Sequence, residues 1–343
     1  MFLFHNPFSN TVSYNRIKFN NFKDTFADLN IEFDSFYNFS DLKKILNSKK
    51  VHIIYTSFHN HYLDKIDLNY VKNFDKNIKI LMDLPIWENP ISSANYTDVK
   101  ELKNNKKFLD LIDKDTVDFF TCYFDKTDLR MQNFKNDTGK DYFYFSHCAN
   151  TRRIYYQYDN FYKCDCSFLG SNLPKKRSIY NKIFPYLKNQ DFKIHGQGWS
   201  KRDNILSFIQ KIGEYKNINF LKKINLKKLD LDEERKIYSS TKININIHNE
   251  YEHFYGGPIN ERFYSIAACK GFQISDNLRQ ISNNFNEGYD VVTWTDRDDF
   301  IDKFKFYLKN YDLANDIAIR QHEKIIKKYT YKVVISDLLK YCA

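Results

Sequence analysis

The residues from 242 to 276 constrain the fold more than any other stretch of this 343-residue chain. Isoleucine alternates with asparagine over residues 243–247, so the isoleucines fall on one face of a β-strand. A loop with Gly256 and Gly257 follows, and we expect a helix over residues 258–269 because proline suits a first helical turn. The next strand is expected over residues 272–276. This order predicts a βαβ unit.

The predicted βαβ unit has the features of an anion site. A glycine loop before a helix leaves backbone amides that point at whatever lies above the helix. Arg262 adds a guanidinium one turn in, and the combination suits a diphosphate. The unit is therefore interpreted as the donor-binding element of a nucleotide-sugar enzyme. The alternative for Arg262 is a surface ion pair with Glu261 or Asp276.

Length and patterning predict two domains of about 150 residues each. Hydrophobic residues make up 42% of the chain and aromatic residues 17%, enough for two cores. Short apolar runs, such as residues 51–56 and 78–82, alternate with longer polar helical segments, which favours parallel sheets covered by helices. We expect an α/β fold of two Rossmann-like, doubly wound domains that face a central cleft.

The expected boundaries follow from the position of these elements. Residues 1–160 are assigned to an N-terminal acceptor domain and residues 161–328 to a nucleotide-sugar-binding domain. Residues 329–343 are assigned to a C-terminal helix, with its return to the first domain as one option.

The formal charge of +10 and a pI near 9.0 leave several partners open. Nucleic acid, an anionic membrane face and phosphorylated substrates all fit a basic chain. The bias of an AT-rich genome also raises the lysine content, and hence the charge, without any partner. Composition alone does not separate these alternatives.

Cysteine usage and hydropathy point to a cytoplasmic protein. Of six cysteines only Cys164 and Cys166 are close, and no metal-binding spacing is present, which favours reduced, buried thiols. The N-terminus lacks the pattern of a signal peptide, and no apolar run approaches the roughly 20 residues of a membrane span. A contact with the inner face of a membrane is therefore expected to be peripheral.

From about Cys164 onward the chain resembles the GT-B glycosyltransferases of the spore-coat CgeB type. The resemblance rests on the order of several short motifs over roughly half of the chain. These motifs are Phe168-Leu169-Gly170 with Arg177, Gly196-Gln197-Gly198-Trp199, Ile237-Tyr238 before Ile245-Asn246-Ile247-His248, Asn260-Glu261-Arg262 with Gly271-Phe272, and Tyr329-Thr330-Tyr331.

The resemblance implies a metal-independent transfer from a nucleotide-diphosphate sugar of the UDP or GDP type, without a further cofactor. The acceptor would be a cell-surface glycan or a protein. The positions assigned to donor binding are Arg177, Gly196, Gly198, Trp199, Tyr255, Gly256, Gly257, Asn260, Arg262 and Ser265. For the glycine and tryptophan positions the alternative is a plain turn with Trp199 in the core, and for Arg177 it is a solvated charge run.

Two departures from related families concern the reaction. Related families have a glutamate for the donor ribose three positions after the arginine, where this chain has Ser265. The upstream partner of the E-x7-E pair is also absent, because Gly257 occupies its position. A retaining mechanism is therefore not implied, and Glu250, Glu252 and Glu261 are the nearby carboxylates that could substitute.

Candidate catalytic groups lie where predicted strands end. Asp83 and the pair His59 and His61 follow strands of the first half, and His248 ends a strand of the second. Each also has a structural interpretation, since aspartate before a turn and histidine on a loop are common without chemistry. The Asp230-x-Asp232 pattern resembles a metal site, but its place at a helix start favours capping.

Two other functions remain open at this stage. The basic charge motivates a phage-type DNA base glucosyltransferase with the same donor site. The absent E-x7-E pair motivates a non-catalytic binding protein that retains the GT-B fold.

Overall fold

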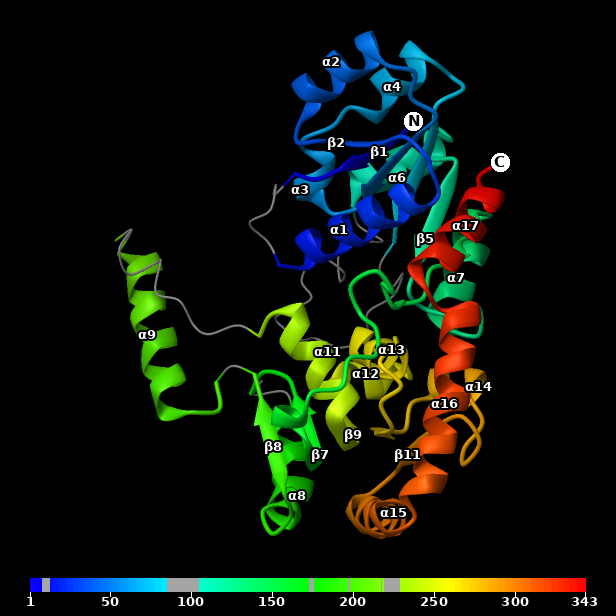
Figure 1. Ribbon diagram of the computed structural model, residues 1–343. Helices are drawn as coiled ribbons and strands as arrows, with labels where there is room; N and C mark the ends of the chain where they lie inside the picture. The colour runs from blue at the N-terminus through cyan, green and yellow to red at the C-terminus, as the bar shows by residue number, and fades with distance from the viewer. Residues whose placement is uncertain (8–12, 85–104, 173–175, 197, 217, 219–228) are drawn as a thin grey trace. The chain divides into compact units, whose positions relative to one another are not determined.

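The computed structural model describes residues 1–7, 13–84, 105–172, 176–196, 198–216, 218 and 229–343. The chain forms two compact units (Figure 1). The first contains Met1–Ser146 together with Tyr331–Ala343, and the second contains His147–Thr330. The predicted boundary after residue 160 thus lies inside the second unit, and the C-terminal helix belongs to the first.

The first unit has a six-stranded parallel sheet in the order β2-β1-β3-β4-β5-β6. Its strands are β1 (Phe2–His5), β2 (Phe33–Phe36), β3 (Ile53–Ser57), β4 (Lys79–Asp83), β5 (Phe119–Cys122) and β6 (Phe143–Tyr144). Its helices are α1 (Ser13–Asp28), α2 (Phe39–Ser48), α3 (Asn60–Leu63), α4 (Leu68–Phe74), α6 (Lys106–Asp113), α7 (Leu129–Thr138) and α17 (Tyr331–Tyr341).

Aromatic side chains fill the core of the first unit. Phe2 of β1 lies 4.5 Å from Phe26 of α1 between ring centroids, and Phe4 lies 5.2 Å from Tyr55 of β3. Helix α17 packs against α1, and its Tyr341 contacts the ring of Phe119 at 5.4 Å. The option that the C-terminal helix returns to the first domain is therefore confirmed.

The second unit has a five-stranded parallel sheet in the order β11-β10-β9-β7-β8. Its strands are β7 (Cys164–Leu169), β8 (Phe192–His195), β9 (Thr241–Asn246), β10 (Gln273–Asp276) and β11 (Val292–Trp294). Its helices are η3 (Asn160–Tyr162), α8 (Arg177–Leu187), α9 (Lys201–Tyr215), α11 (Leu231–Ser240), α12 (Glu250–Tyr255), α13 (Glu261–Ala268), α14 (Arg279–Asn284), α15 (Arg297–Lys309) and α16 (Tyr311–Lys328).

The βαβ unit predicted from residues 242–276 is present as β9, α13 and β10. The isoleucines of β9 are buried, and β9 pairs in parallel with β10. Helix α13 begins at Glu261 rather than at 258, because the side chain of Asn260 accepts the amide of Phe263 and caps the helix there. The short helix α12 was not predicted; it ends at Gly256, whose φ of +74° suits a left-handed cap.

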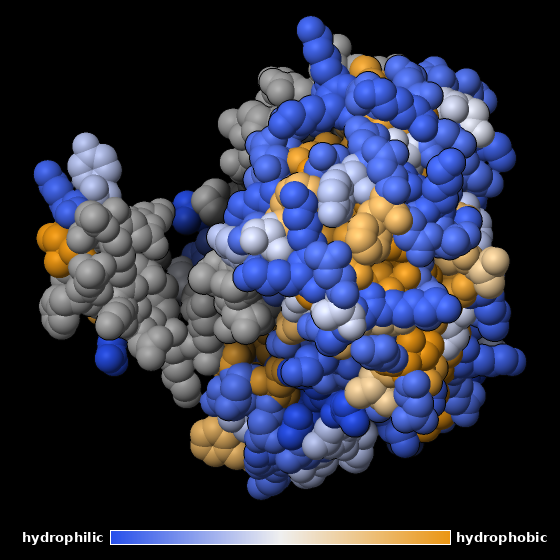
Figure 2. Space-filling view, turned by 90° about the horizontal axis from the view of Figure 1, so that it is seen from above, coloured by the Kyte–Doolittle hydropathy of each residue, from blue (hydrophilic) through white to orange (hydrophobic). Residues whose placement is uncertain are grey.

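These two sheets confirm the predicted α/β class with two doubly wound parallel units. None of the helices in the described parts of the chain is long and apolar enough to cross a bilayer. Figure 2 shows that the described side chains on the face seen from above are mostly hydrophilic, with hydrophobic ones in small groups.

Capping of α11 yields a first prediction. Asp230 accepts the amide of Glu233 at 2.8 Å, and the Glu233 side chain accepts the amide of Asp230, which confirms the capping interpretation over a metal site. We expect Asp230→Ala to lower the free energy of unfolding by about 1 kcal/mol, measured by urea titration with circular dichroism. Asp298→Ala, which removes an exposed carboxylate from the first turn of α15, is the control and should change it by less than about 0.5 kcal/mol.

Candidate functional site

The sheet of the second unit reverses its winding between β7 and β9. From β7 the chain proceeds to β8 on one side, and later returns to β9 on the other side of β7. Carboxyl ends of strands at such a reversal diverge and leave room for a ligand. The residues that follow β7 and β9 therefore form the candidate ligand site of the second unit.

Arg262, on the first turn of α13, reaches the end of β7. Its guanidinium lies 5.2 Å from the ring centroid of Phe168. A Cβ atom at Gly170 would come within 2.8 Å of Nη2, so a side chain at this position would displace the guanidinium. Nη1 is buried and has no hydrogen-bond partner among the described residues. A buried guanidinium nitrogen without a partner suggests that a ligand supplies the acceptor.

Lys176, just before α8, is the second cation at this point. It is only 5% exposed, and its Nζ donates to the carbonyl of Ile247 at 2.7 Å, where β9 has just ended. Burial, together with the nearby charge of Arg262, lowers the pKa of Lys176 to about 8. Within the described residues neither cation forms an ion pair. A buried positive charge and a half-buried one thus lie near each other beside β7 and β9.

The sequence predicts that Arg177, and not Lys176, is the second cation of the donor site. The structure exposes Arg177, whose Nε is 3.4 Å from the side-chain oxygen of Asn172. The run of three cations carries no sequence signal that tells which of them turns inward, and Lys175 lies outside the described residues. A role of Arg177 in donor binding stays a prediction.

The expectation of free amides in the glycine loop is wrong for most of that loop. The amides of Gly256 and Gly257 donate to His253 and Glu252 carbonyls, and the amide of Ile259 donates to the side chain of Gln280. Proline at 258 has no amide hydrogen. These donors are consumed because the two glycines cap the C-terminal end of α12 and because Gln280 of α14 reaches Ile259. Any anion bound here therefore depends mainly on Arg262 and Lys176.

A buried carboxylate organises the neighbouring part of the site. Asp276, at the end of β10, accepts from Nδ1 of His248 at 2.5 Å, from the backbone amide of His248 at 2.7 Å and from Nε2 of His253 at 2.6 Å. These interactions outweigh its burial and hold the pKa of Asp276 well below its ordinary value. His248 is fully buried, and its Nε2 has no partner in the described structure.

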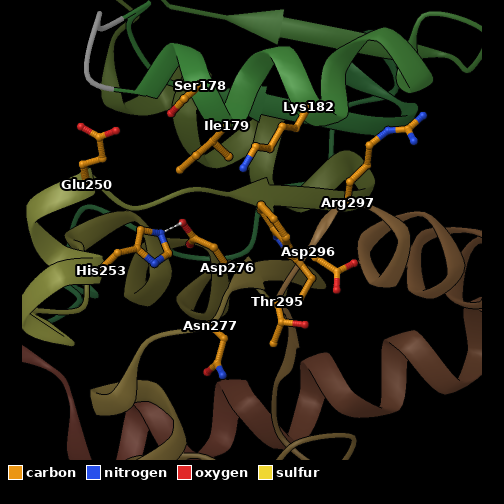
Figure 3. Close-up of a pocket in the computed structure, with 11 residues that line it drawn as sticks. Ser178, Ile179, Lys182, Glu250, His253, Asp276, Asn277, Thr295, Asp296 and Arg297 are labelled. Carbon is orange, nitrogen blue, oxygen red and sulfur yellow. Dashed lines mark hydrogen bonds and ion pairs between the residues drawn. The ribbon is translucent and has the colours of Figure 1, made fainter.

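His253 and Asp276 also face a cavity of about 720 Å³. Figure 3 shows Ser178, Ile179 and Lys182 of α8 on one side of it and Glu250 and His253 of α12 on another. Asn277, Thr295, Asp296 and Arg297 line the rest together with Trp294. The cavity is a mixed polar site at the carboxyl ends of β10 and β11. His253 was not predicted, although a histidine loop after one strand and an aspartate ending its neighbour could have indicated the pair.

The Gly196–Trp199 turn packs against the core. Nε1 of Trp199 donates to the Gly170 carbonyl at 2.6 Å, and its ring lies 5.1 Å from that of Tyr180. Gly196 has a φ of +128°, and a Cβ there would meet the Gly170 carbonyl oxygen at 2.4 Å. The contacts support the alternative of a plain turn with Trp199 in the core. Gln197 lies outside the described residues.

The remaining predicted donor positions surround α13. Asn260 donates from its side chain to Asn246 at 3.0 Å as well as capping the helix, so it ties α13 to the end of β9. Tyr255 and Ser265 are buried. Ser265 has a hydroxyl where related families have a carboxylate. Its role in donor binding stays a prediction.

The catalytic candidates of the first unit lie on adjacent strand ends. Ser57 is the register partner of Asp83, and its hydroxyl is 2.8 Å from Nδ1 of His59. The rings of His59 and His61 lie 5.2 Å apart. Asp83 pairs with Lys18 at 2.8 Å and accepts from Thr121 at 3.2 Å, which gives it a structural role.

His5 is a further histidine that the sequence did not single out. It ends β1 at the winding reversal of the first unit, next to β3, where Nδ1 lies 2.9 Å from the Thr56 hydroxyl. Burial lowers the pKa of His5 to about 3, so the ring is neutral, and its Nε2 has no partner in the described structure.

Metal-binding and thiol chemistry have little support in this structure. Within the described ranges no group of three or more His, Cys, Asp or Glu side chains could hold a metal ion. All six cysteines are among the described residues; they form no disulfide and are buried. Burial raises the pKa of the Cys269 thiol to about 12, so this group is not a nucleophile near neutral pH.

Comparison with known protein families finds a similarity in the C-terminal half of the chain. Residues 176–340 match a family described as glycosyl transferase-like. The resemblance of this half to glycosyltransferases is thereby confirmed, whereas the CgeB type within them stays a prediction. None of the curated proteins matches the chain.

Solved structures show a similar fold over nearly the whole chain. Sucrose-phosphate synthase from Thermosynechococcus elongatus has a TM-score of 0.63 at 8% identity, over 99% of this chain and 97% of that one. An alpha-glucosyltransferase in complex with UDP-glucose and DNA has 0.62 at 11%, over 99% and 98%. HepE from Anabaena, in complex with UDP, has 0.60 at 9%, over 99% and 98%. At these identities the likeness shows the fold, which is the predicted GT-B fold.

The pairing of His253 with Asp276 generates a pH prediction. Burial alone lowers the pKa of His253, but the hydrogen bond and charge of Asp276 outweigh it and raise the pKa above the ordinary 6.5. The pair therefore stabilises the fold fully below pH 6.5, and this contribution is lost as the pH rises through the folded-state pKa. His253→Gln should lower the thermal unfolding temperature at pH 5.5 and change it much less at pH 9.

His195→Gln is the control for this measurement. Burial lowers the pKa of His195, so its protonation at low pH destabilises the folded chain, and its replacement should become relatively favourable as the pH falls. An equal loss for His253→Gln at both pH values would contradict the assigned ion pair.

Proposed function

We propose that this protein is a glycosyltransferase that transfers a sugar from a nucleotide-diphosphate donor to a glycan or protein acceptor. The similarity of residues 176–340 to glycosyltransferases supports sugar transfer. In this proposal the diphosphate lies at the carboxyl ends of β7 and β9, and the first unit contributes acceptor binding.

The observation that carries the proposal is that Lys176 and Arg262 lie near each other at the ends of β9 and β7. Burying a charge is unfavourable unless an opposite charge or several hydrogen bonds compensate it. Among the described residues the two cations have one carbonyl acceptor, that of Ile247, and the buried Nη1 of Arg262 has none. A diphosphate bound here would supply both the hydrogen-bond acceptors and the negative charge that Arg262 and Lys176 lack. The same groups would then stabilise the charge that develops on the leaving diphosphate.

The magnitudes agree with a site that also needs a pocket for the nucleoside. Hydrogen bonds to charged groups contribute about 1.5–3 kcal/mol each. Micromolar binding requires about 8 kcal/mol, so the two cations supply roughly half of it. The predicted donor positions at Gly196, Gly198 and Tyr255 are the candidates for the remaining contacts in this proposal.

We propose the following roles for the candidate acid–base groups of the reaction. His248 is fully buried and held by Asp276, so we assign it a role in positioning the loop after β9. Glu250 lines the cavity and is the carboxylate best placed there to replace the absent glutamate. Asp83 and His59 remain candidates for the base, although the ion pair of Asp83 with Lys18 must open before Asp83 can accept a proton.

Nucleotide binding tests the proposal directly. We expect UDP or GDP to raise the thermal unfolding temperature, since a ligand at 100 times its dissociation constant stabilises the folded state by about 2.7 kcal/mol. Arg262→Gln and Lys176→Met should each abolish most of that increase. Lys188→Met removes an exposed cation at the end of α8 and is the matched control. Absence of stabilisation by UDP, GDP, dTDP and CMP would refute the donor site.

The lowered pKa of Lys176 predicts how donor affinity depends on pH. With a pKa of about 8 in the free protein, the lysine loses its charge as the pH rises from 7 to 9, and diphosphate affinity should fall. Lys176→Arg keeps its charge over this range. Calorimetric titration of UDP or GDP should therefore show a pH dependence in the unsubstituted protein that is largely absent from Lys176→Arg. The same pH dependence in both proteins would assign the titration to another group.

A further inference from the structure

Helix α9 exposes a row of large apolar side chains. Ile205 is 58% exposed, Phe208 65%, Ile212 38% and Tyr215 86%. Their spacing of three, four and three residues places them along one face of a helix. Scattered apolar residues are normal on a surface, but a continuous row marks an interaction site.

The row is not needed by the core of the second unit. The two buried hydrophobic clusters of this unit draw on strands β7, β9, β10 and β11 and on helices α8, α11, α13, α14, α15 and α16. None of the described residues of α9 belongs to either cluster. The apolar face of α9 is therefore available to a partner.

The sequence from the start of α9 to residue 228 is strongly basic. Residues 201–228 contain eight lysines and arginines but two acidic residues, Asp203 and Glu214. This segment accounts for an excess of six positive charges, more than half of the formal net charge of +10. Lys201, Arg202 and Lys216, at the two ends of α9, are exposed. A partner for this helix must therefore combine negative charge with an apolar interior.

We propose that α9 docks on the surface of an anionic phospholipid bilayer. The apolar row enters the boundary between head groups and acyl chains, and the exposed Lys201, Arg202 and Lys216 contact the lipid phosphates, as amphipathic interfacial helices do. Nucleic acid would satisfy the charge but offers little to four large apolar side chains. A second copy would bring the same positive segment against itself, which is unfavourable. The proposal is independent of the reaction that the protein catalyses.

Co-sedimentation with vesicles tests the proposal. The full chain is mixed with vesicles of phosphatidylcholine alone, or of phosphatidylcholine and phosphatidylglycerol in equal parts. We expect at least tenfold stronger binding to the anionic vesicles, and this binding should weaken as salt is raised because the Debye length shortens. Phe208→Gln combined with Ile212→Gln should weaken it at least tenfold. Glutamine favours helix, so α9 is retained.

Two further variants separate the apolar row from the charge and from general hydrophobicity. Phe161→Gln removes an equally exposed phenylalanine, 79% exposed in η3, and should bind vesicles as the unsubstituted protein does. Lys201→Gln combined with Arg202→Gln should reduce binding to anionic vesicles only. Unchanged unfolding temperatures establish that each variant is folded.

Several results would overturn the proposal. Equal binding to both vesicle types, or binding that the α9 variants leave unchanged, excludes docking through this helix. Self-association that Phe208→Gln with Ile212→Gln abolishes, in a protein that does not bind vesicles, would assign the row to a second copy. Salt-sensitive binding of duplex DNA that the Lys201 and Arg202 variant abolishes, again without vesicle binding, would assign the segment to nucleic acid.

Discussion

Two like charges, one buried and one half-buried, lie near each other at the ends of β7 and β9, and the candidate site of the second unit depends on them. Arg262 lies against Gly170, where a side chain would displace its guanidinium, and Lys176 reaches the end of β9 by pointing inward from the start of α8. Each contact uses a different element of the fold. Their repulsion is tolerated in the free chain partly because burial makes the ammonium easier to deprotonate. An anionic ligand would convert this repulsion into attraction, so binding and local stability are coupled here.

Asp276 has the opposite role, because it is a single buried anion with several donors around it. By accepting from the amide and ring of His248 and from the ring of His253, it joins the loop after β9 to helix α12 and to its own strand. The backbone amides of the glycine loop, which were expected to be free, donate instead to carbonyls of α12 and to the side chain of Gln280. The rigidity of this edge therefore comes from side-chain hydrogen bonds rather than from the glycines.

The sequence predicted the elements whose signal is local and missed those that depend on distant partners. Alternating isoleucines identified β9, and the α/β class with two doubly wound units followed from similar runs. The four residues of β1 gave too short a pattern, since their burial depends on Phe26 and Tyr55 far along the chain. Among the site residues, Arg262 was predicted from its place after the glycine loop. Lys176 and Arg177 are neighbours of equal charge, and only the start of α8 decides which one is buried.

The return of α17 to the first unit has a consequence for how the protein is made. Tyr341 completes the packing beside Phe119 and Phe143, although the whole second unit separates these residues in the chain. During synthesis the second unit can acquire all of its strands while the first still lacks one of its helices. The domain translated first is therefore the one completed last, and until then the surface of α1 that α17 covers is open to non-native association.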